Sequence, residues 1–255
     1  MAWQTELTDI GPNRIAPRGR PIEDLMGNAR FSDVIFLLFT GREPSESESR
    51  FVDAILTSSI DHGVSPPSTN ATRTVAACRS PLSACVAAGV LTIGDVHGGA
   101  IEKCMRTLMA AVEEARASGR AAGEVAAGAV RQAKEQGRRL QGFGHRLHTE
   151  DPRAVRLFAL ARELGLAGPH IEMADAFVAA FAEQGSKPLP INVDGAIGAC
   201  LADLGFPPEM GNAFFIISRV PGLVAHAVEE MRRERPMRQV DPKEAEYIGP
   251  KRTEG

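Results

Sequence analysis

The feature that most constrains the fold of this chain is a helical pattern that returns along its length. Apolar residues recur at helical intervals in residues 51–56, 171–181 and 197–204. Small residues dominate residues 71–91, as in a closely packed helix, and residues 100–139 favour one or two amphipathic helices joined near residue 118. Repeated alternating strands and internal repeats are both absent from the sequence. The sequence therefore predicts an all-α fold.

Glycine and proline predict where this pattern breaks. Residues 9–21 hold three prolines, two glycines and three arginines, which favours an exposed arm or loop. A further loop is expected at residues 61–70. Residues 34–39 fit either a helix or a buried strand, and the spacing leaves both open. The long apolar segment 214–228 is expected to kink at Pro221.

Composition excludes several classes of protein. The 255 residues are 44% apolar with a formal net charge of -3, so a core is expected, and nucleic acid or an anionic membrane surface is not expected as a partner. The four cysteines form no CxxC pair, which is typical of reduced thiols. The N-terminus lacks an apolar signal region, and no run approaches the roughly 18 apolar residues of a membrane span. These features predict a soluble, cytoplasmic protein.

A histidine between glycines stands directly before a predicted helix. Residues 94–100 read GDVHGGA, with His97 at the centre. Backbone amides and the positive end of the helix would surround its imidazole and keep it neutral. A neutral imidazole N–H can polarise a thioester carbonyl and stabilise the adjacent enolate. The alternative is a histidine that only caps the helix beside a flexible turn.

A second histidine follows two glycines in the segment LQGFGHR, residues 140–146. The missing side chains of Gly142 and Gly144 would let a ligand lie on the backbone, although the spacing is not that of a dinucleotide fingerprint. Arg153 follows in an Asp-Pro-Arg triplet, and its planar fork matches a carboxylate. His145 and Arg153 would then hold two ends of one small anion. The alternative is a surface loop that caps the next helix.

A carboxylate, Asp194, stands between a short apolar segment and a helical one in the sequence INVDG, residues 191–195. Burial there would raise its pKa and suit it to act as a general acid or base. The alternative is that Asp194 is simply the N-cap of the helix.

The other polar residues give weaker signals. His62 lies in the predicted loop and would either bind a substrate or be solvated. His148, three residues after His145, suggests a metal site, but no HExxH or Cys/His spacing supports one, and we expect no metal. Basic residues within 131–146 predict a solvated helix face, with contact to a phosphate as the alternative.

Taken together and in this order, the three motifs resemble citrate synthases, whose pattern is an HGGA histidine, a GxGH histidine followed by DPR, and an NVD aspartate. The resemblance extends to four more segments, residues 20–25, 34–41, 218–219 and 247–250. It implies a citrate synthase-like all-α fold, in which residues 1–100 and 205–255 form a large helical domain and residues 101–204 a smaller inserted one.

The resemblance also implies a role for each residue. In condensation, Asp194 would take a methyl proton from acetyl-CoA, His97 would stabilise the enol, and His145 would donate to the oxaloacetate carbonyl; cleavage reverses these steps. The residues that would bind the oxaloacetate portion are His62, His145, Arg153 and Arg219. Those that would bind coenzyme A are Gly142, Phe143, Gly144, Arg146 and Lys187. A homodimer with shared sites is implied, in which Arg235, or failing that Arg238, reaches the partner's site.

Departures from the pattern separate cleavage from condensation. The chain is shorter than typical citrate synthases, and Gly195 follows the NVD aspartate where they usually carry a larger residue. The segments 61–63, 91–95 and 192–198 look closer to citryl-CoA lyases, including the C-terminal domain of ATP citrate lyase. This predicts a lyase that cleaves citryl-CoA to acetyl-CoA and oxaloacetate. The alternatives are a citrate or 2-methylcitrate synthase, a lyase for a related 3-hydroxyacyl-CoA, and a non-catalytic binder of a CoA thioester.

Overall fold

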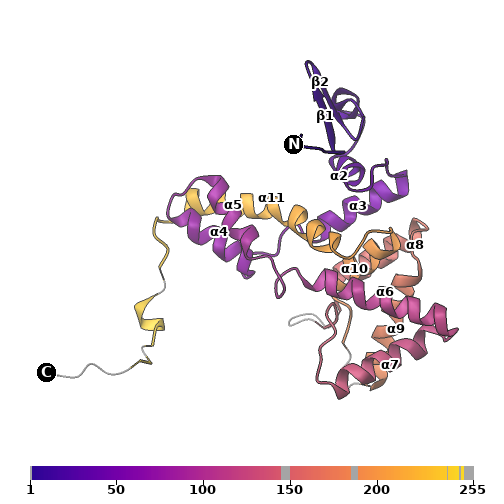
Figure 1. Ribbon diagram of the computed structural model, residues 1–255. Coiled ribbons are helices and arrows are strands. Elements are labelled where there is room, and N and C mark those ends of the chain that lie inside the picture. The colour runs from indigo at the N-terminus through magenta and orange to yellow at the C-terminus, as the bar shows by residue number, and fades with distance from the viewer. Residues whose placement is uncertain (1, 145–149, 185–188, 240, 247, 250–255) are drawn as a thin grey trace. The chain divides into compact units, whose positions relative to one another are not determined.

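A computed structural model of the protein describes residues 2–144, 150–184, 189–239, 241–246 and 248–249 (Figure 1). The described chain is mainly helical, which confirms the predicted all-α class. It divides into two compact units, the first made of residues 1–61 and 93–219 and the second of residues 62–92 and 220–255. The domain boundaries implied by the resemblance, after residues 100 and 204, stay a prediction.

The first unit contains a β-hairpin and most of the helices. Strand β1 (Thr8–Gly11) pairs antiparallel with β2 (Arg14–Pro17). The helices are α1 (Ile22–Leu25), α2 (Phe31–Thr40), α3 (Glu46–Ser58), α6 (Ala100–Ser118), α7 (Ala122–Glu135), α8 (Pro152–Glu163), α9 (Pro169–Gln184) and α10 (Val193–Asp203). Figure 1 shows α7 and α9 side by side, and α10 packs against α6, α8 and α9.

The core of the first unit forms where the predicted apolar stripes meet. Its largest fully buried side chains include Phe36, Phe51, Ile101, Met105, Leu108, Phe177, Ile197 and Leu201. Helix α10 approaches α6 closely, since a Cβ atom on Gly198 would lie 3.1 Å from the carbonyl oxygen of Ile101. Small residues in α10 therefore set the short distance between the two helices.

The second unit consists of α4 (Pro67–Ala77), α5 (Leu82–Leu91), the C-terminal part of α11 (Met210–Arg233) and a 3-10 turn, Pro242–Glu244. Helices α4 and α5 pack side by side. A buried ion-pair network joins α4 to α11, because the Arg73 guanidinium contacts the fully buried Glu230 carboxylate at 2.7 Å. Helix α11 begins in the first unit, and Pro221 lies inside it; the predicted kink stays a prediction.

Three expectations about local structure were wrong, and a fourth was open. The loop expected at residues 61–70 ends at Pro66, because α4 begins at Pro67 and a proline suits the first turn of a helix. Residues 9–21 form most of the hairpin rather than a loop, because Pro12 and Asn13, with Asn13 in the left-handed region at φ 55°, make a two-residue turn. Residues 71–91 are two helices, interrupted where Arg79 is left-handed at φ 59° before Pro81. Residues 34–39 lie in α2, so the helix is the correct alternative.

Helix α11 is long and apolar enough to cross a membrane by length and composition, contrary to the expectation from sequence. Its first half belongs to the core of the first unit. The Phe214 ring packs edge-on against Phe39 and Phe206, and the Arg219 guanidinium donates to the carbonyl of Ser59 at 2.9 Å. A helix in a protein core can have the same length and composition. The buried Phe214 and Phe215 show that this part of α11 is a core helix.

Candidate functional site

Asp194 lies in the first turn of α10, and the pKa of its carboxyl lies near neutral pH. Although the residue as a whole is only partly buried, burial of the carboxyl raises its pKa to about 6. The positive charges of Arg153 and Arg219 oppose this rise, and the negative charge of Asp151 adds to it. The N-cap is Asn192, whose side chain accepts from the N–H of Gly195 at 3.1 Å. The alternative that Asp194 is merely the cap is therefore wrong.

The glycine segment before His145 pairs with the strand-like entry to α10. The N–H of Asn192 donates to the Gly142 carbonyl at 3.0 Å, and that of Gly144 donates to the Pro190 carbonyl at 2.7 Å. The Asn192 side chain donates to the Gly144 carbonyl at 2.9 Å. These hydrogen bonds hold the two motifs together, although about fifty residues separate them in sequence.

Gly142 and Gly195 permit this close approach. Gly142 has φ 86°, and a Cβ atom there would lie 2.5 Å from the sulfur of Cys104. A Cβ atom on Gly195 would lie 2.3 Å from the carbonyl oxygen of Gly142. Only glycine fits at either position. Helices α10 and α6 therefore pack against the backbone of Gly142. The contact of Gly142 with a ligand stays a prediction.

Phe143, between the two glycines, points into the core. It is 7% exposed, and its ring centroid lies 5.5 Å from that of Phe177 and 5.2 Å from that of Phe181. Its side chain therefore anchors the segment, and only its backbone remains for the predicted contact with coenzyme A.

Arg153, in the first turn of α8, is held by Asp151. The Arg153 guanidinium donates to Asp151 through Nε at 3.0 Å and Nη2 at 2.9 Å. Asp151 is the N-cap of α8 and also accepts from the N–H of Val193, the residue before Asp194, at 3.0 Å. Burial alone would raise the pKa of Asp151, but the hydrogen bonds and charge of Arg153 together with the N–H of Val193 hold it below its ordinary value. Asp151 therefore stays ionised.

His97 lies in a tight turn directly before α6. The N–H groups of His97 and Gly99 both donate to the Gly94 carbonyl, at 2.9 Å each, so these amides are used inside the turn rather than left for the imidazole as expected. The His97 ring meets the Phe215 ring edge-on at 5.7 Å between centroids. Gly98, at φ 89°, is required because a Cβ atom there would lie 2.8 Å from Phe215.

Arg219 reaches the same phenyl ring from α11. Its guanidinium carbon lies 4.8 Å from the Phe215 centroid, and the residue is only 3% exposed. Burial lowers the pKa of Arg219, while the negative charges of Asp61 and Asp194 oppose that change. The described structure thus brings His97, Asp194, Arg153 and Arg219 into one cluster within the first unit.

The other predicted side chains belong to the second unit or lie outside the described residues. His145, Arg146 and Lys187 lie outside the described residues, as does the His148 of the metal alternative. His62 and Arg235 belong to the second unit, where Arg235 is exposed. Within the described ranges, no three His, Cys, Asp or Glu side chains gather in a way that would hold a metal ion.

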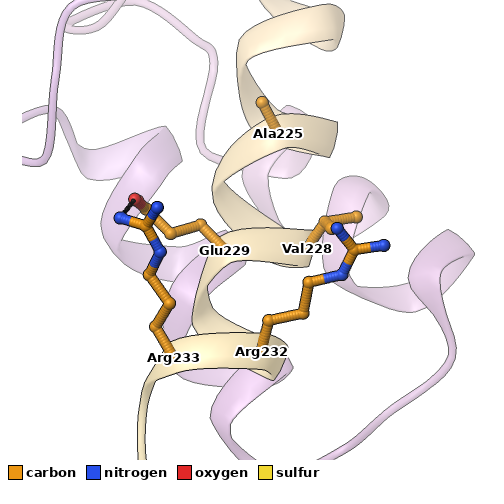
Figure 2. A pocket seen from close by; sticks show the side chains of 5 residues that line it. All are labelled: Ala225, Val228, Glu229, Arg232 and Arg233. Atoms are coloured by element: carbon orange, nitrogen blue, oxygen red, sulfur yellow. Dashed lines mark hydrogen bonds and ion pairs between the residues drawn. The ribbon is translucent and has the colours of Figure 1, made fainter.

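A surface hollow in the second unit includes none of the predicted residues. Figure 2 shows that Ala225, Val228, Glu229, Arg232 and Arg233, all from the last turns of α11, line it. The Glu229 carboxylate pairs with the Arg233 guanidinium across it at 3.2 Å. Because one helix supplies the whole lining, we treat the hollow as a feature of that helix surface.

Sequence reasoning missed three residues that build the cluster: Asp151, Asn192 and Phe215. A signal existed for the first two, because Asp before Pro and Asn directly before a helix are both typical of N-caps. Nothing in the sequence singled out Phe215, whose contacts with His97 and Arg219 depend on the tertiary fold.

Known proteins resemble this chain in sequence and in fold. The family described as "Citrate synthase, C-terminal domain" matches residues 40–240. The chain belongs to the citrate synthase family. A citrate synthase of Haloferax volcanii is 31% identical over 234 residues, covering 91% of this chain and 57% of that protein. The chain therefore spans little more than half the length of this relative.

Two solved structures resemble the chain over nearly its whole length. The citryl-CoA lyase of Hydrogenobacter thermophilus is 39% identical, with a TM-score of 0.90 covering 100% of this chain and 97% of that one. The ATP citrate lyase of Methanothrix soehngenii, solved with citrate and coenzyme A, is 22% identical, with a TM-score of 0.80 covering 98% of this chain and 42% of that one. The second is a likeness of fold alone.

Proposed function

We propose that this chain is a citryl-CoA lyase, which cleaves (3S)-citryl-CoA to acetyl-CoA and oxaloacetate through an enol or enolate intermediate. The observation that carries the proposal is the buried Asp194 carboxyl, with a pKa raised to about 6, beside the guanidinium groups of Arg153 and Arg219. Such a carboxyl can deliver a proton to carbon near neutral pH, and the arginines match the carboxylates of an oxoacid product.

The proposed reaction balances without an external proton or oxidant. His145 removes the hydroxyl proton of citryl-CoA, the carbon–oxygen bond becomes a carbonyl, and the adjacent carbon–carbon bond breaks. The electron pair of that bond forms the enolate of acetyl-CoA, which the His97 imidazole stabilises. The protonated Asp194 carboxyl then transfers its proton to the enolate carbon and gives the methyl group. His145 and Asp194 return to their starting states by exchange with water.

The Hydrogenobacter thermophilus lyase supports cleavage as the direction, because it is 39% identical to this chain over 97% of its own length. Gly195 supports it as well, since the geometry leaves no room for the larger residue that is usual in citrate synthases. Coenzyme A is proposed to lie along the backbone of residues 142–146, with Lys187 near a phosphate. His62 is proposed to bind the oxaloacetate portion.

The second candidate is a citrate or 2-methylcitrate synthase. The observation in its favour is the relative from Haloferax volcanii, which is named a citrate synthase. The same cluster would serve condensation, with Asp194 as the base rather than the acid.

Assembly and compartment complete the proposal. We propose a cytoplasmic homodimer with no metal requirement, in which Arg235 enters the partner's active site. Arg238 is less suited to that role, because its guanidinium is paired with Glu230 of its own chain through Nε at 3.0 Å and Nη2 at 2.8 Å.

The test is product formation by the purified protein. Incubation with (3S)-citryl-CoA should release oxaloacetate and acetyl-CoA in equal amounts, measured by mass spectrometry. Incubation of acetyl-CoA or propionyl-CoA with oxaloacetate should release little free thiol. Rapid thiol release would favour the synthase, and no oxaloacetate from folded protein with any 3-hydroxyacyl-CoA would exclude the lyase.

A further inference from the structure

Asp151 has more hydrogen bonds than a helix cap requires. Its side chain is fully buried and accepts four hydrogen bonds, from the backbone N–H of Arg153 at 3.1 Å, Arg153 Nε at 3.0 Å, Arg153 Nη2 at 2.9 Å and the N–H of Val193 at 3.0 Å. A cap alone needs only the first of these. The other three tie one carboxylate to a predicted substrate-binding side chain and to the backbone just before Asp194.

These contacts fix the relative placement of two helix starts. Arg153 lies in the first turn of α8, and Val193 is the first residue of α10. Because each carboxylate oxygen contacts the guanidinium, and one of them also contacts the N–H of Val193, a shift of either helix start would break a charge-assisted hydrogen bond. A guanidinium has five N–H groups, and Asp151 uses two of those of Arg153, so a substrate carboxylate could accept from the other three as far as the described residues show.

The charge of Asp151 also acts on Asp194. Among the described residues, four groups face the Asp194 carboxyl from the elements around it: Arg153 of α8, Arg219 of α11, the thiol of Cys104 in α6 and Asp151. Burial, with a smaller contribution from Asp194, raises the pKa of Cys104 to about 12, so this thiol carries no charge near neutral pH. Asp151 is then the one negative group among the four, and it disfavours the ionised form of Asp194.

We propose that Asp151 is a positioning residue for the reaction: it aligns the Arg153 guanidinium and the first turn of α10 and sets the charge around Asp194, without touching the substrate. This inference rests on the proposed function for its kinetic consequence, but its structural part does not need that function. Asp151→Asn keeps the size of the side chain and removes its charge. The new amide NH2 then takes the place of one carboxylate oxygen and faces N–H donors of Arg153 or Val193, from which it cannot accept a hydrogen bond.

Asp203 provides a matched control. Its side chain is also fully buried, and it joins α10 to the start of α9 by accepting from the N–H groups of Gly168, His170 and Ile171 at 2.8, 2.9 and 3.1 Å. Asp203→Asn therefore disturbs a comparable buried cap of a neighbouring helix, and Asp203 has no contact with Arg153 among the described residues.

The first measurement is a carbon-13 NMR titration of the aspartate carboxyls, with the Asp194 signal assigned from Asp194→Asn. Relative to wild type, Asp151→Asn should lower the pKa of Asp194, because a repelling charge is removed and Arg153 is no longer neutralised. Asp203→Asn should leave the pKa of Asp194 unchanged. This comparison needs no substrate, so it remains decisive if citryl-CoA is not cleaved. An unchanged or raised pKa in folded Asp151→Asn would overturn the proposal.

Kinetics give the second measurement. For citryl-CoA, Asp151→Asn should raise KM on the order of tenfold, in line with the loss of one oriented charged contact, and move the alkaline limb of the pH profile to lower pH. Asp203→Asn should change the unfolding temperature but neither KM nor that limb. Equal kinetic effects in the two variants would reduce Asp151 to a structural cap, whereas an inactive wild type would count against the proposed function only.

Discussion

Each unit contains a buried cluster of arginine and carboxylate groups, but the two clusters differ in how completely the carboxylates are paired. In the second unit the buried Glu230 contacts Arg73 at 2.7 Å and Arg238 at 2.8 Å. In the first unit Arg153 is paired with Asp151, and Asp194 accepts no hydrogen bond from any residue that the structure describes. The same kinds of side chain are therefore paired in one cluster and left partly unpaired in the other.

We propose that this difference separates a structural cluster from a reactive one. A buried carboxylate that is fully hydrogen-bonded to arginine stays ionised and holds elements together. A buried carboxyl whose attraction to nearby arginines does not offset its desolvation has a raised pKa and can exchange a proton near neutral pH. Asp194 is of the second kind, with a pKa raised to about 6, and this is why we place the chemistry in the first unit.

The largest effect is expected from removing the reactive carboxyl. Asp194→Asn should lower turnover of citryl-CoA about 10³-fold, the usual range for loss of a general acid or base, while leaving affinity for the substrate within a few-fold. Stopped-flow release of oxaloacetate measures turnover, and calorimetry measures affinity. A variant that keeps wild-type turnover would show that the two clusters do not differ in function.

Next in size is the loss of the structural carboxylate. Glu230→Gln should lower the free energy of unfolding by roughly 3 kcal/mol, the lower end of the range for a broken buried ion pair, because Arg73 loses its fully buried partner and keeps only the half-exposed Glu229 and Glu234. Urea unfolding measures this change. Glu163→Gln in the exposed Arg156 pair, at 2.7 Å, is the matched control and should hardly move the midpoint. Equal small shifts in both variants would contradict the structural role of Glu230.

Asp194→Asn should also stabilise the fold, in a way that depends on pH. Burial raises the pKa of Asp194 from 3.8 to about 6, so the folded state loses stability as pH rises through this interval. The variant should gain on the order of 3 kcal/mol at pH 7.5, since one pKa unit is about 1.4 kcal/mol, and almost nothing below pH 4. Unfolding at both pH values measures it, and a gain of equal size at each would contradict the raised pKa.

A smaller effect is expected from the backbone contact beneath the site. Gly195→Ala should destabilise the fold by about 1–3 kcal/mol, as overpacking does, and slow turnover, because the new methyl group meets the Gly142 carbonyl. Gly128→Ala in α7, where nothing lies within 4 Å, should instead stabilise the fold by up to about 1 kcal/mol. Thermal unfolding and oxaloacetate release measure both. Loss of function in both variants alike would refute the argument from close packing.

Sequence periodicity was enough to predict the helical class and most helices, because each apolar stripe is a local property. It failed at the hairpin and at the break between α4 and α5, where single left-handed residues, Asn13 and Arg79, redirect the chain. Amino-acid composition does not show which residue other than glycine will adopt the left-handed conformation.

The candidate site was predictable where its residues belong to a motif. Asp194, Arg153 and His97 were chosen for their neighbours in sequence, and the described structure brings their surroundings together. The contacts of Asp151 with Val193 and of Phe215 with His97 join segments far apart in sequence, so no local pattern indicates them. The roles of His145, Arg146 and Lys187 stay predictions.

The central claim is that the Asp194 carboxyl is the proton donor in cleavage of citryl-CoA, and the pH dependence of kcat/KM tests it most directly. This parameter reports the ionisation of the free enzyme. With a pKa near 6, cleavage should fall as pH rises above about 6, and the residual activity of Asp194→Asn should lack that limb. A wild-type profile that stays level from pH 5 to about pH 8, or a limb that survives in Asp194→Asn, would contradict the account.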